Sequence, residues 1–322
     1  MSTADTLRVR VAAKTQEAKD ICTFELVALD GSELPAFTAG SHIDVHIPGG
    51  LTRQYSLCNA PQETHRYVIG VLRDAASRGG SVAMHDAVQA GSELQISCPK
   101  NHFELSGEAT QSLLLAGGIG VTPLLSMAET LSAQGAQFAM HYCSRTKERT
   151  AFVERIQGSA FGAHVHLHFD DGDAAQKLDI PDLLSAPKAG QHLYVCGPKG
   201  FMDAVLNTAK AAGWPAAQLH SEFFAAEVQS MESDGSFEVE LSGSGQVVVV
   251  AKDQTVVQAL VAAGVDVPTA CEQGVCGTCL TRVVSGTPDH RDQYLTDDEH
   301  AANDQFLPCC SRSLSPRLVI AL

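Results

Sequence analysis

Hydrophobic and polar positions alternate in short runs through the first hundred residues of the chain. Successive side chains of a strand point to opposite faces, so such runs are typical of strands with one buried face. Turn residues break the runs at intervals that predict an antiparallel barrel or sandwich. The six runs are LRVRVAA, ICTFELVAL, SHIDVHI, RQYSLCN, RYVIGVL and ELQISC, between Leu7 and about Phe103.

The pattern changes at about Gln111, where apolar runs begin to alternate with helical segments. This alternation predicts a parallel sheet covered by helices, an α/β unit. SLLLAGG leads into a helix from about Val121 to Ser132, and FAMHYC into one near Ala151. HVHLHF is followed by a polar loop, and HLYVCG by a helix from about Pro198 to Ala211.

A polar segment without clear periodicity, residues 225–236, predicts a linker. Beyond it come FEVEL, QVVVV, a short helix near Thr255 to Ala263, a cysteine-rich loop and a closing strand LVIAL. The sequence therefore predicts three units and one linker. The expected boundaries are 1–106 for the β unit, 107–226 for the α/β unit, 227–236 for the linker and 237–322 for the cysteine-bearing unit.

The composition is that of a globular protein with an acidic C-terminal part. The chain of 322 residues is 44% hydrophobic and carries a net charge of −15, and residues 227–322 hold 14 acidic and five basic side chains. This charge argues against nucleic acid or an anionic membrane as partner and indicates docking on a basic patch, although solubility alone would also explain it. With no apolar leader in the first thirty residues, we expect a cytoplasmic protein.

Four cysteines follow the spacing of a plant-type 2Fe-2S ferredoxin. Cys271, Cys276 and Cys279 form C-x₄-C-x₂-C, and Cys309 follows after a gap of 29 residues. Thiolates are soft ligands suited to iron, and four of them complete the coordination of two sulfide-bridged irons. Glycines in the loop leave its amides free to point at the sulfurs.

Two other interpretations of these cysteines are structural zinc and reduced core thiols. Zinc normally needs a second close pair of ligands, and the adjacent Cys309 and Cys310 are too tightly spaced to supply both. We choose Cys309 as the fourth ligand because Pro308-Cys309, followed by Ser311-Arg312, matches the ferredoxin register. Cys310 is then a structural thiol.

Two glycine-containing turns in the α/β unit indicate a nucleotide site. An apolar strand ends in Gly117-Gly118-x-Gly120, and a helix follows with Thr122 and Pro123 in its first turn. Glycines allow a pyrophosphate to approach, and a helix N-terminus offers free N–H groups, although a simple tight turn would have the same pattern. A second strand ends in Cys196-Gly197-Pro198, at the strand edge where open sheets bind ligands.

The β unit contains residues suited to a flavin. Arg53, Tyr55 and Ser56 share a strand, and Arg78-Gly79-Gly80-Ser81 opens a short helix. An arginine and a helix start suit a phosphate, while a tyrosine and a serine suit a flat heteroaromatic ring. Either piece alone is better explained as a turn or an exposed strand arginine.

These motifs, in this order over almost the whole chain, resemble the phthalate dioxygenase reductase family. The family comprises three-domain reductases of Rieske-type aromatic oxygenases, including vanillate demethylase reductases. The resemblance implies a flavin barrel of the ferredoxin reductase type, an NAD domain and a C-terminal β-grasp-like ferredoxin domain. It also implies FMN rather than FAD, a choice that the residues alone leave open.

The resemblance assigns roles to individual positions. Arg53, Tyr55 and Ser56 would contact the flavin, and the turn from Arg78 to Ser81 would face its phosphate. Cys196 would lie near the nicotinamide, and Phe224 would stack on the flavin. For Cys196 and Phe224 the alternative is a buried core residue.

We expect NADH rather than NADPH as the reductant. Asp170, Asp171 and Asp173 follow the third strand of the α/β sheet, where carboxylates would repel a 2′-phosphate. Ser144-Arg145 is an argument in the other direction, since an arginine can hold such a phosphate.

The predicted function is an NADH-dependent oxidoreductase in which hydride passes to FMN and single electrons pass through the 2Fe-2S cluster to a Rieske-type aromatic oxygenase or demethylase. One alternative is a reductase for a different acceptor, such as a cytochrome or a di-iron hydroxylase. Another is a redox sensor or electron carrier without turnover.

Overall fold

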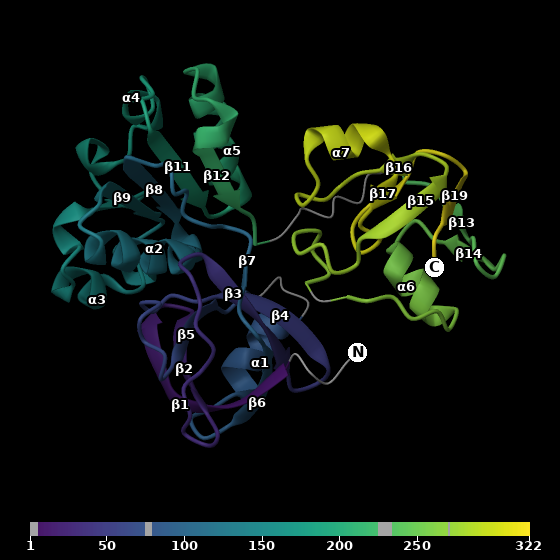
Figure 1. Cartoon of the computed structure of the whole chain (residues 1–322), viewed down its shortest axis with the longest axis horizontal. Helices are drawn as coiled ribbons and strands as arrows, with labels where there is room; N and C mark the ends of the chain where they lie inside the picture. The colour runs from purple at the N-terminus through teal and green to yellow at the C-terminus, as the bar shows by residue number, and fades with distance from the viewer. Residues whose placement is uncertain (1–5, 75–78, 225–233, 270) are drawn as a thin grey trace. The chain divides into compact units, whose positions relative to one another are not determined.

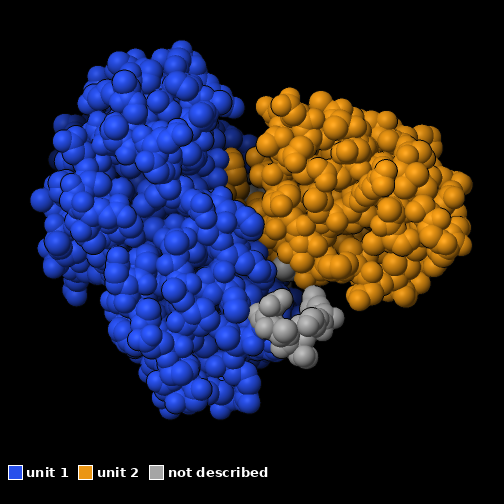
Figure 2. All heavy atoms as spheres, viewed as in Figure 1, with its two compact units in different colours: residues 1–222 blue, residues 223–322 orange. Residues whose placement is uncertain are grey.

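The computed structural model describes residues 6–74, 79–224, 234–269 and 271–322. Contacts divide the chain into two compact units, residues 1–222 and 223–322, which Figure 2 colours blue and orange. Among the described residues no helix is both long enough and apolar enough to span a bilayer. The predicted boundaries within residues 1–222, and the linker at 227–236, remain predictions.

The first unit begins with an antiparallel sheet in the order β4-β3-β6-β1-β2-β5 (Figure 1). A bridge between Leu57, just after β4, and Ile69 of β5 joins the two ends of this order, so the sheet closes into the predicted barrel. Inward side chains such as Val9, Phe24 and Ile96 are fully buried and form its core. The elements are β1 (Thr6–Ala18), β2 (Ile21–Ala28), β3 (Ser41–Ile47), β4 (Leu51–Ser56), β5 (Tyr67–Leu72), α1 (Gly80–Ala87), β6 (Glu93–Ser97) and β7 (Lys100–Asn101), the last a short strand that the pattern did not predict.

The rest of the first unit is a parallel sheet in the order β10-β9-β8-β11-β12. The chain leaves β8 in one direction through α2 and leaves β11 in the other through α5, so right-handed crossovers place these helices on opposite faces (Figure 1). Strand order therefore reverses between β8 and β11, the position at which open sheets bind ligands. The elements are β8 (Gln111–Gly117), α2 (Val121–Ala133), β9 (Gln137–Ser144), α3 (Val153–Gly158), β10 (Val165–Phe169), α4 (Ile180–Leu183), β11 (Gln191–Cys196), α5 (Lys199–Ala211) and β12 (Leu219–Glu222).

The second unit is a small mixed sheet in the order β14-β13-β19-β15-β17, packed against α6. Its first and last strands, β13 and β19, pair in parallel at the centre, as in a β-grasp. A capping box at Thr255 and Gln258 starts α6 where the sequence predicts it. The elements are β13 (Phe237–Leu241), β14 (Val247–Val250), α6 (Val256–Ala262), β15 (Thr281–Ser285), β16 (Pro288–Asp289), α7 (Asp297–Ala302), β17 (Gln305–Phe306), β18 (Arg312–Ser313) and β19 (Arg317–Ile320).

Candidate functional site

Arg53 on β4 packs directly against the start of α1. A Cβ atom at Gly80 would lie 2.7 Å from Arg53 Cγ, so glycine is required where the arginine stem crosses the helix. The guanidinium donates from Nη1 to the Thr52 carbonyl oxygen over 2.7 Å, whereas buried Nη2 has no partner among the described residues. A buried charged donor without a partner is costly, which fits a site for an anionic group.

The N-terminus of α1 adds further donors at the same place. Gly79 caps the helix in a left-handed conformation with φ of 86°, and no side chain caps the first turn. The open N–H groups and the helix dipole favour a phosphate. Ser81 is engaged with the preceding loop, because its Oγ accepts from the Asp74 amide at 3.1 Å. Arg78 lies outside the described residues.

Tyr55 and Ser56 continue the strand from the arginine toward the parallel sheet. Tyr55 is half-buried against the barrel core, and burial raises the pKa of its hydroxyl, which therefore stays protonated. The Ser56 hydroxyl donates to Glu222 Oε2 over 3.2 Å. This bond connects the end of β4 to the end of β12.

Glu222 and Cys196 face each other in the register of the parallel sheet. Burial raises the pKa of Glu222 to about 8, and the hydrogen bond from Ser56 opposes that shift only in part. Burial, followed by the charge of Glu222, raises the pKa of Cys196 well above its ordinary value. At neutral pH the structure therefore brings together a hydroxyl, a protonated carboxyl and a neutral thiol.

Glu222 is a site residue that the sequence analysis missed. Its only signal was its position at the carboxyl end of the last parallel strand, beside the ends of β8 and β11 where the motifs lie. Phe224, two residues later, is half-buried, and its stacking on a flavin stays a prediction.

The two glycine turns of the parallel sheet touch each other. A Cβ at Gly120 would lie 2.6 Å from the Gly197 amide nitrogen, and one at Gly117 would lie 2.9 Å from Pro198 Cδ. Gly118 has φ of 54°, which other residues rarely adopt. Close packing of the two turns therefore explains these glycines, and it places both turns at one edge of the sheet.

Thr122 and Pro123 are both buried in the first turn of α2. The Thr122 hydroxyl donates to the Ile119 carbonyl oxygen over 3.0 Å. Its methyl group lies against Gly70 of β5, where a Cβ would come within 2.9 Å. Thr122 thus joins the parallel sheet to the barrel, and contact of either residue with a nucleotide stays a prediction.

The residues relevant to nucleotide choice lie together at the ends of β9 and β10. The Asp170 amide donates to the Ser144 carbonyl oxygen at 3.0 Å, and the Asp171 amide donates to that of Arg145 at 3.3 Å. The Asp170, Asp171 and Arg145 side chains are all exposed. Carboxylates and a guanidinium therefore occupy the same edge, and the preference for NADH stays a prediction.

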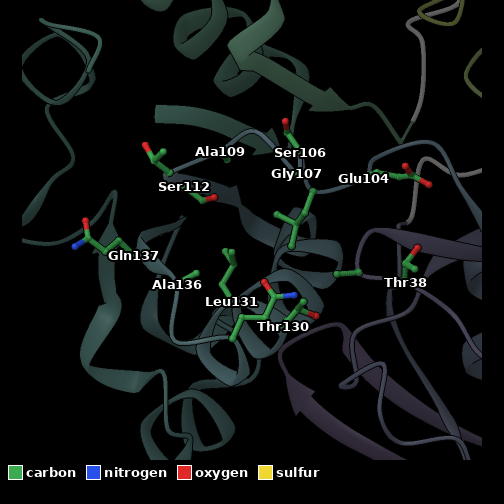
Figure 3. Close-up of a pocket in the computed structure, with 14 residues that line it drawn as sticks. Thr38, Glu104, Ser106, Gly107, Ala109, Ser112, Thr130, Leu131, Ala136 and Gln137 are labelled. Atoms are coloured by element: carbon green, nitrogen blue, oxygen red, sulfur yellow. The ribbon is translucent and has the colours of Figure 1, made fainter. Parts of the chain in front are cut away.

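A cavity of about 380 Å³ lies at the other edge of the parallel sheet (Figure 3). It is bounded by the amino ends of β8 and β9 and the carboxyl end of α2, with Ser112, Gln137 and Thr130 in its wall. Ligand sites of open sheets lie at the carboxyl ends of strands. This cavity is therefore separate from the turns at Gly117 and Cys196.

The four predicted cluster cysteines lie in two pairs in the second unit. Hydrogen bonding between the thiols of Cys271 and Cys276 lowers the pKa of Cys276 and raises that of Cys271. Cys279 is likewise bonded to Cys309, which raises the pKa of Cys279. Two thiols for each of two irons is the donor set that a 2Fe-2S cluster needs.

The loop around these thiols supplies main-chain donors. The Gln273 amide donates to Cys271 Sγ at 3.2 Å, and the Gly274 amide bonds to Cys309. Gly277 has φ of 71°, and a Cβ there would lie 2.7 Å from the Tyr294 hydroxyl oxygen. The chemistry of the donor set and these amides fit a cluster, with Cys271, Cys276, Cys279 and Cys309 as its ligands.

A second group of metal-ligating side chains, His290, Asp292 and His300, lies in the same unit. The buried Asp292 carboxylate already accepts from the Leu295 amide at 2.9 Å and from His300 Nε2 at 3.2 Å. It also accepts from the Tyr294 amide at 3.2 Å. These hydrogen bonds explain why the three side chains lie together: they stabilise the turn that carries Tyr294.

Comparison with known proteins covers the chain from end to end. Residues 239–314 match the 2Fe-2S iron-sulfur cluster binding domain, and residues 97–219 match the N-terminal domain of dimethylamine monooxygenase subunit DmmA-like proteins. The chain is 55% identical over 313 residues to a vanillate O-demethylase oxidoreductase of Pseudomonas putida, covering 97% of this chain and 98% of that protein. It is 40% identical over 317 residues to a phthalate dioxygenase reductase of Burkholderia cepacia, covering 98% and 97%.

Solved structures agree with these matches. A phthalate dioxygenase reductase, described as a modular structure for electron transfer from pyridine nucleotides to 2Fe-2S, superposes with a TM-score of 0.80 at 40% identity, over 98% of each chain. An intact type IV self-sufficient cytochrome P450 monooxygenase superposes with a TM-score of 0.81 at 37% identity, over 98% of this chain and 41% of that one.

Proposed function

The chain belongs to the family of vanillate O-demethylase oxidoreductases and phthalate dioxygenase reductases, and from this premise we propose that it delivers electrons from NADH, through FMN and a 2Fe-2S cluster, to a Rieske-type aromatic oxygenase or demethylase. As a member of this family it is an oxidoreductase, the reductase component of a multicomponent oxygenase. The family resemblance and the fold class drawn from the sequence are confirmed.

One observation carries the proposal. A single chain holds the Ser56–Glu222–Cys196 contact at the carboxyl edge of a parallel sheet and a four-cysteine loop of ferredoxin spacing. The first is a largely buried, uncharged setting suited to a nicotinamide, and the second is suited to one-electron chemistry. FMN, when bound, supplies the conversion between two-electron and one-electron transfer.

Each site residue then has a role in holding a group. Arg53, with Gly79, Gly80 and Ser81 at the start of α1, holds the flavin phosphate, and Tyr55 and Ser56 line its ring. Glu222 keeps a proton on its carboxyl and orients the Ser56 hydroxyl. The turns from Gly117 to Pro123 and from Cys196 to Pro198 hold the dinucleotide.

We place the flavin domain at residues 1–106, the NAD domain at 107–226 and the ferredoxin domain at 237–322, in the cytoplasm. The oxygenase docks on the acidic ferredoxin domain, beside the cluster. Cys276 is the one predicted ligand that is partly exposed, whereas Cys271, Cys279 and Cys309 are buried. The 40% exposed Tyr294 packs against the neighbouring Gly277. Asp297, Asp298 and Glu299, in the first turn of α7 shortly after Tyr294, add negative charge to this domain.

A cytochrome is the second candidate acceptor, because the chain resembles 41% of a cytochrome P450 monooxygenase. Purified protein should be yellow-brown, lose flavin absorbance on mixing with NADH, and support turnover when combined with a Rieske oxygenase. If the protein supports turnover of a P450 but of none of a broad panel of Rieske oxygenases, the acceptor is a cytochrome and not a Rieske oxygenase. If NADH does not bleach the flavin, the remaining hypothesis is a redox sensor or electron carrier without turnover.

A further inference from the structure

A buried ion pair holds the end of the predicted linker in the second unit. The Arg291 guanidinium donates two hydrogen bonds to the Asp234 carboxylate, from Nη2 to Oδ1 at 2.6 Å and from Nη1 to Oδ2 at 3.0 Å. Both side chains are only 8% exposed. Two parallel N–H···O bonds fix distance and orientation together, which a single bond does not.

Arg312 also contacts this stretch of chain, at Asp234 and Gly235. Its Nε lies 3.7 Å from Asp234 Oδ2, and its Nη2 donates to the Gly235 carbonyl oxygen over 3.0 Å. The guanidinium also lies over the Phe237 ring, 5.2 Å from the centroid. Side chain and main chain of the linker end are thus held to one surface.

These two arginines belong to the segments that build the cluster site. Arg312 follows the ligand Cys309 by three residues, and the Arg291 amide donates to Ser311 Oγ over 3.2 Å. Two residues after Arg291, the Gln293 amide donates to the Gly274 carbonyl oxygen in the cysteine loop at 2.9 Å. The linker end is therefore connected to the cluster surroundings through few bonds.

A buried ion pair is weak evidence for stability, because apolar side chains of similar volume often stabilise a protein as well. Fixing one geometry is the better-supported use of such a pair. Here the fixed element is the described stretch just before β13, residues 234–236, within the cluster-bearing unit. That stretch determines the effective length of the tether and the direction from which the cluster is presented.

We propose that Asp234 is a positioning residue for electron transfer between flavin and cluster, because it pins the end of the linker to the segments around the cluster. The inference rests on the proposed function. In the step concerned, one electron passes from the reduced flavin to the oxidised cluster, and no covalent bond to the protein forms or breaks. Asp234 touches neither group and acts through Arg291 and Arg312.

The test compares Asp234→Ala with Asp289→Ala in the full-length holoprotein. Asp289 is the matched control, since its Oδ2 accepts from the same Arg291 Nη2 at 2.5 Å but belongs to β16 and not to the predicted linker. Flash photoreduction followed by re-equilibration between flavin and cluster reads the internal step without hydride transfer. We expect Asp234→Ala to slow this step about fivefold through a longer, less oriented tether, and Asp289→Ala to leave it within about twofold.

Two further readouts separate positioning from simple damage. The cluster reduction potential and electron paramagnetic resonance spectrum should be unchanged in both variants, and amide hydrogen exchange at Gly235 to Phe237 should rise only in Asp234→Ala. Equal rates in all three proteins, or equal slowing in both variants, would overturn the proposal. If Asp234→Ala does not load its cluster, Asp234→Asn is judged by the same criteria. Loss of flavin bleaching by NADH in the unaltered protein would instead refute the proposed function.

Discussion

The Ser56 hydroxyl and the Glu222 carboxyl group are joined by a 3.2 Å hydrogen bond across 166 positions of the chain. Ser56 ends a barrel strand and Glu222 ends a strand of the parallel sheet, so the bond depends on the packing of the two sheets. We expect Ser56→Ala to slow reduction of the flavin by NADH about tenfold, the effect of losing one hydrogen bond to a half-buried, ionisable partner. Stopped-flow absorbance measures this rate, and Ser106→Ala, on a loop at the opposite edge of the parallel sheet, is the control. Equal rates in Ser56→Ala and the unaltered protein would remove Ser56 from the site.

The raised pKa of Glu222 makes stability depend on pH. The ordinary value is 4.5, and burial raises the pKa to about 8 in the folded protein. The folded protein thus keeps a proton that the unfolded chain releases, so the contribution to stability is fully present below about pH 4.5 and is lost as the pH rises through about 8. Glu222→Gln should therefore gain in melting temperature relative to the unaltered protein between pH 5.5 and pH 8.5. If the difference in melting temperature between the two proteins stays constant across this pH range, the raised pKa of Glu222 is contradicted.

We predict that Arg53 binds the phosphate of the flavin. Removing a buried charged donor from an anion site costs about 2 kcal/mol, or roughly 30-fold in affinity. Arg53→Ala should weaken FMN binding by that amount, while riboflavin, which lacks the phosphate, should bind both proteins alike. Flavin fluorescence titration measures both constants. An equal loss for FMN and riboflavin would place Arg53 elsewhere on the flavin.

The packing of the two glycine turns can be tested by substituting Gly120, with Gly200 as the control. A Cβ at Gly120 would overlap the main chain of Cys196 and Gly197, whereas one at Gly200 meets nothing within 4 Å. Gly120→Ala should destabilise the protein by about 2 kcal/mol and raise KM for NADH, because the two turns must separate. Gly200→Ala should leave both unchanged. Thermal melting and steady-state kinetics measure these effects, and a normal melting temperature for Gly120→Ala would show that the turns do not pack as described.

Cys309 and Cys310 are adjacent, and one substitution in each identifies the ligand. Cys310 Sγ is directed to the Leu307 carbonyl oxygen at 3.7 Å, while the Cys309 thiol is hydrogen-bonded to Cys279 and also contacts Cys310. Cys309→Ser, like Cys279→Ser, should abolish the visible absorbance of the cluster, and Cys310→Ser should retain it. Iron content and electron paramagnetic resonance measure the outcome. Loss of the cluster in Cys310→Ser alone would reverse the assignment.

The sequence predicted what local pattern can encode. Strand alternation and the helix after Gly120 gave the barrel and the parallel sheet, and cysteine spacing gave the 2Fe-2S loop, because each depends on residues close together in the chain. Glu222 could not be found in this way, since its importance comes from pairing with Cys196 and bonding to Ser56, both set by tertiary packing. The contact between Asp234 and Arg291 spans 57 positions and likewise has no local signal.

The Asp234 contact also determines where the chain can be cut. A fragment beginning at Phe237, the first residue of β13, would keep every strand of the second unit but lose the carboxylate partner of Arg312. Its guanidinium would keep only two main-chain carbonyl oxygens and the Phe237 ring. One beginning a few residues before Asp234 would retain the carboxylate that both arginines share. A ferredoxin fragment of this chain should therefore begin before Asp234 and not at the first strand.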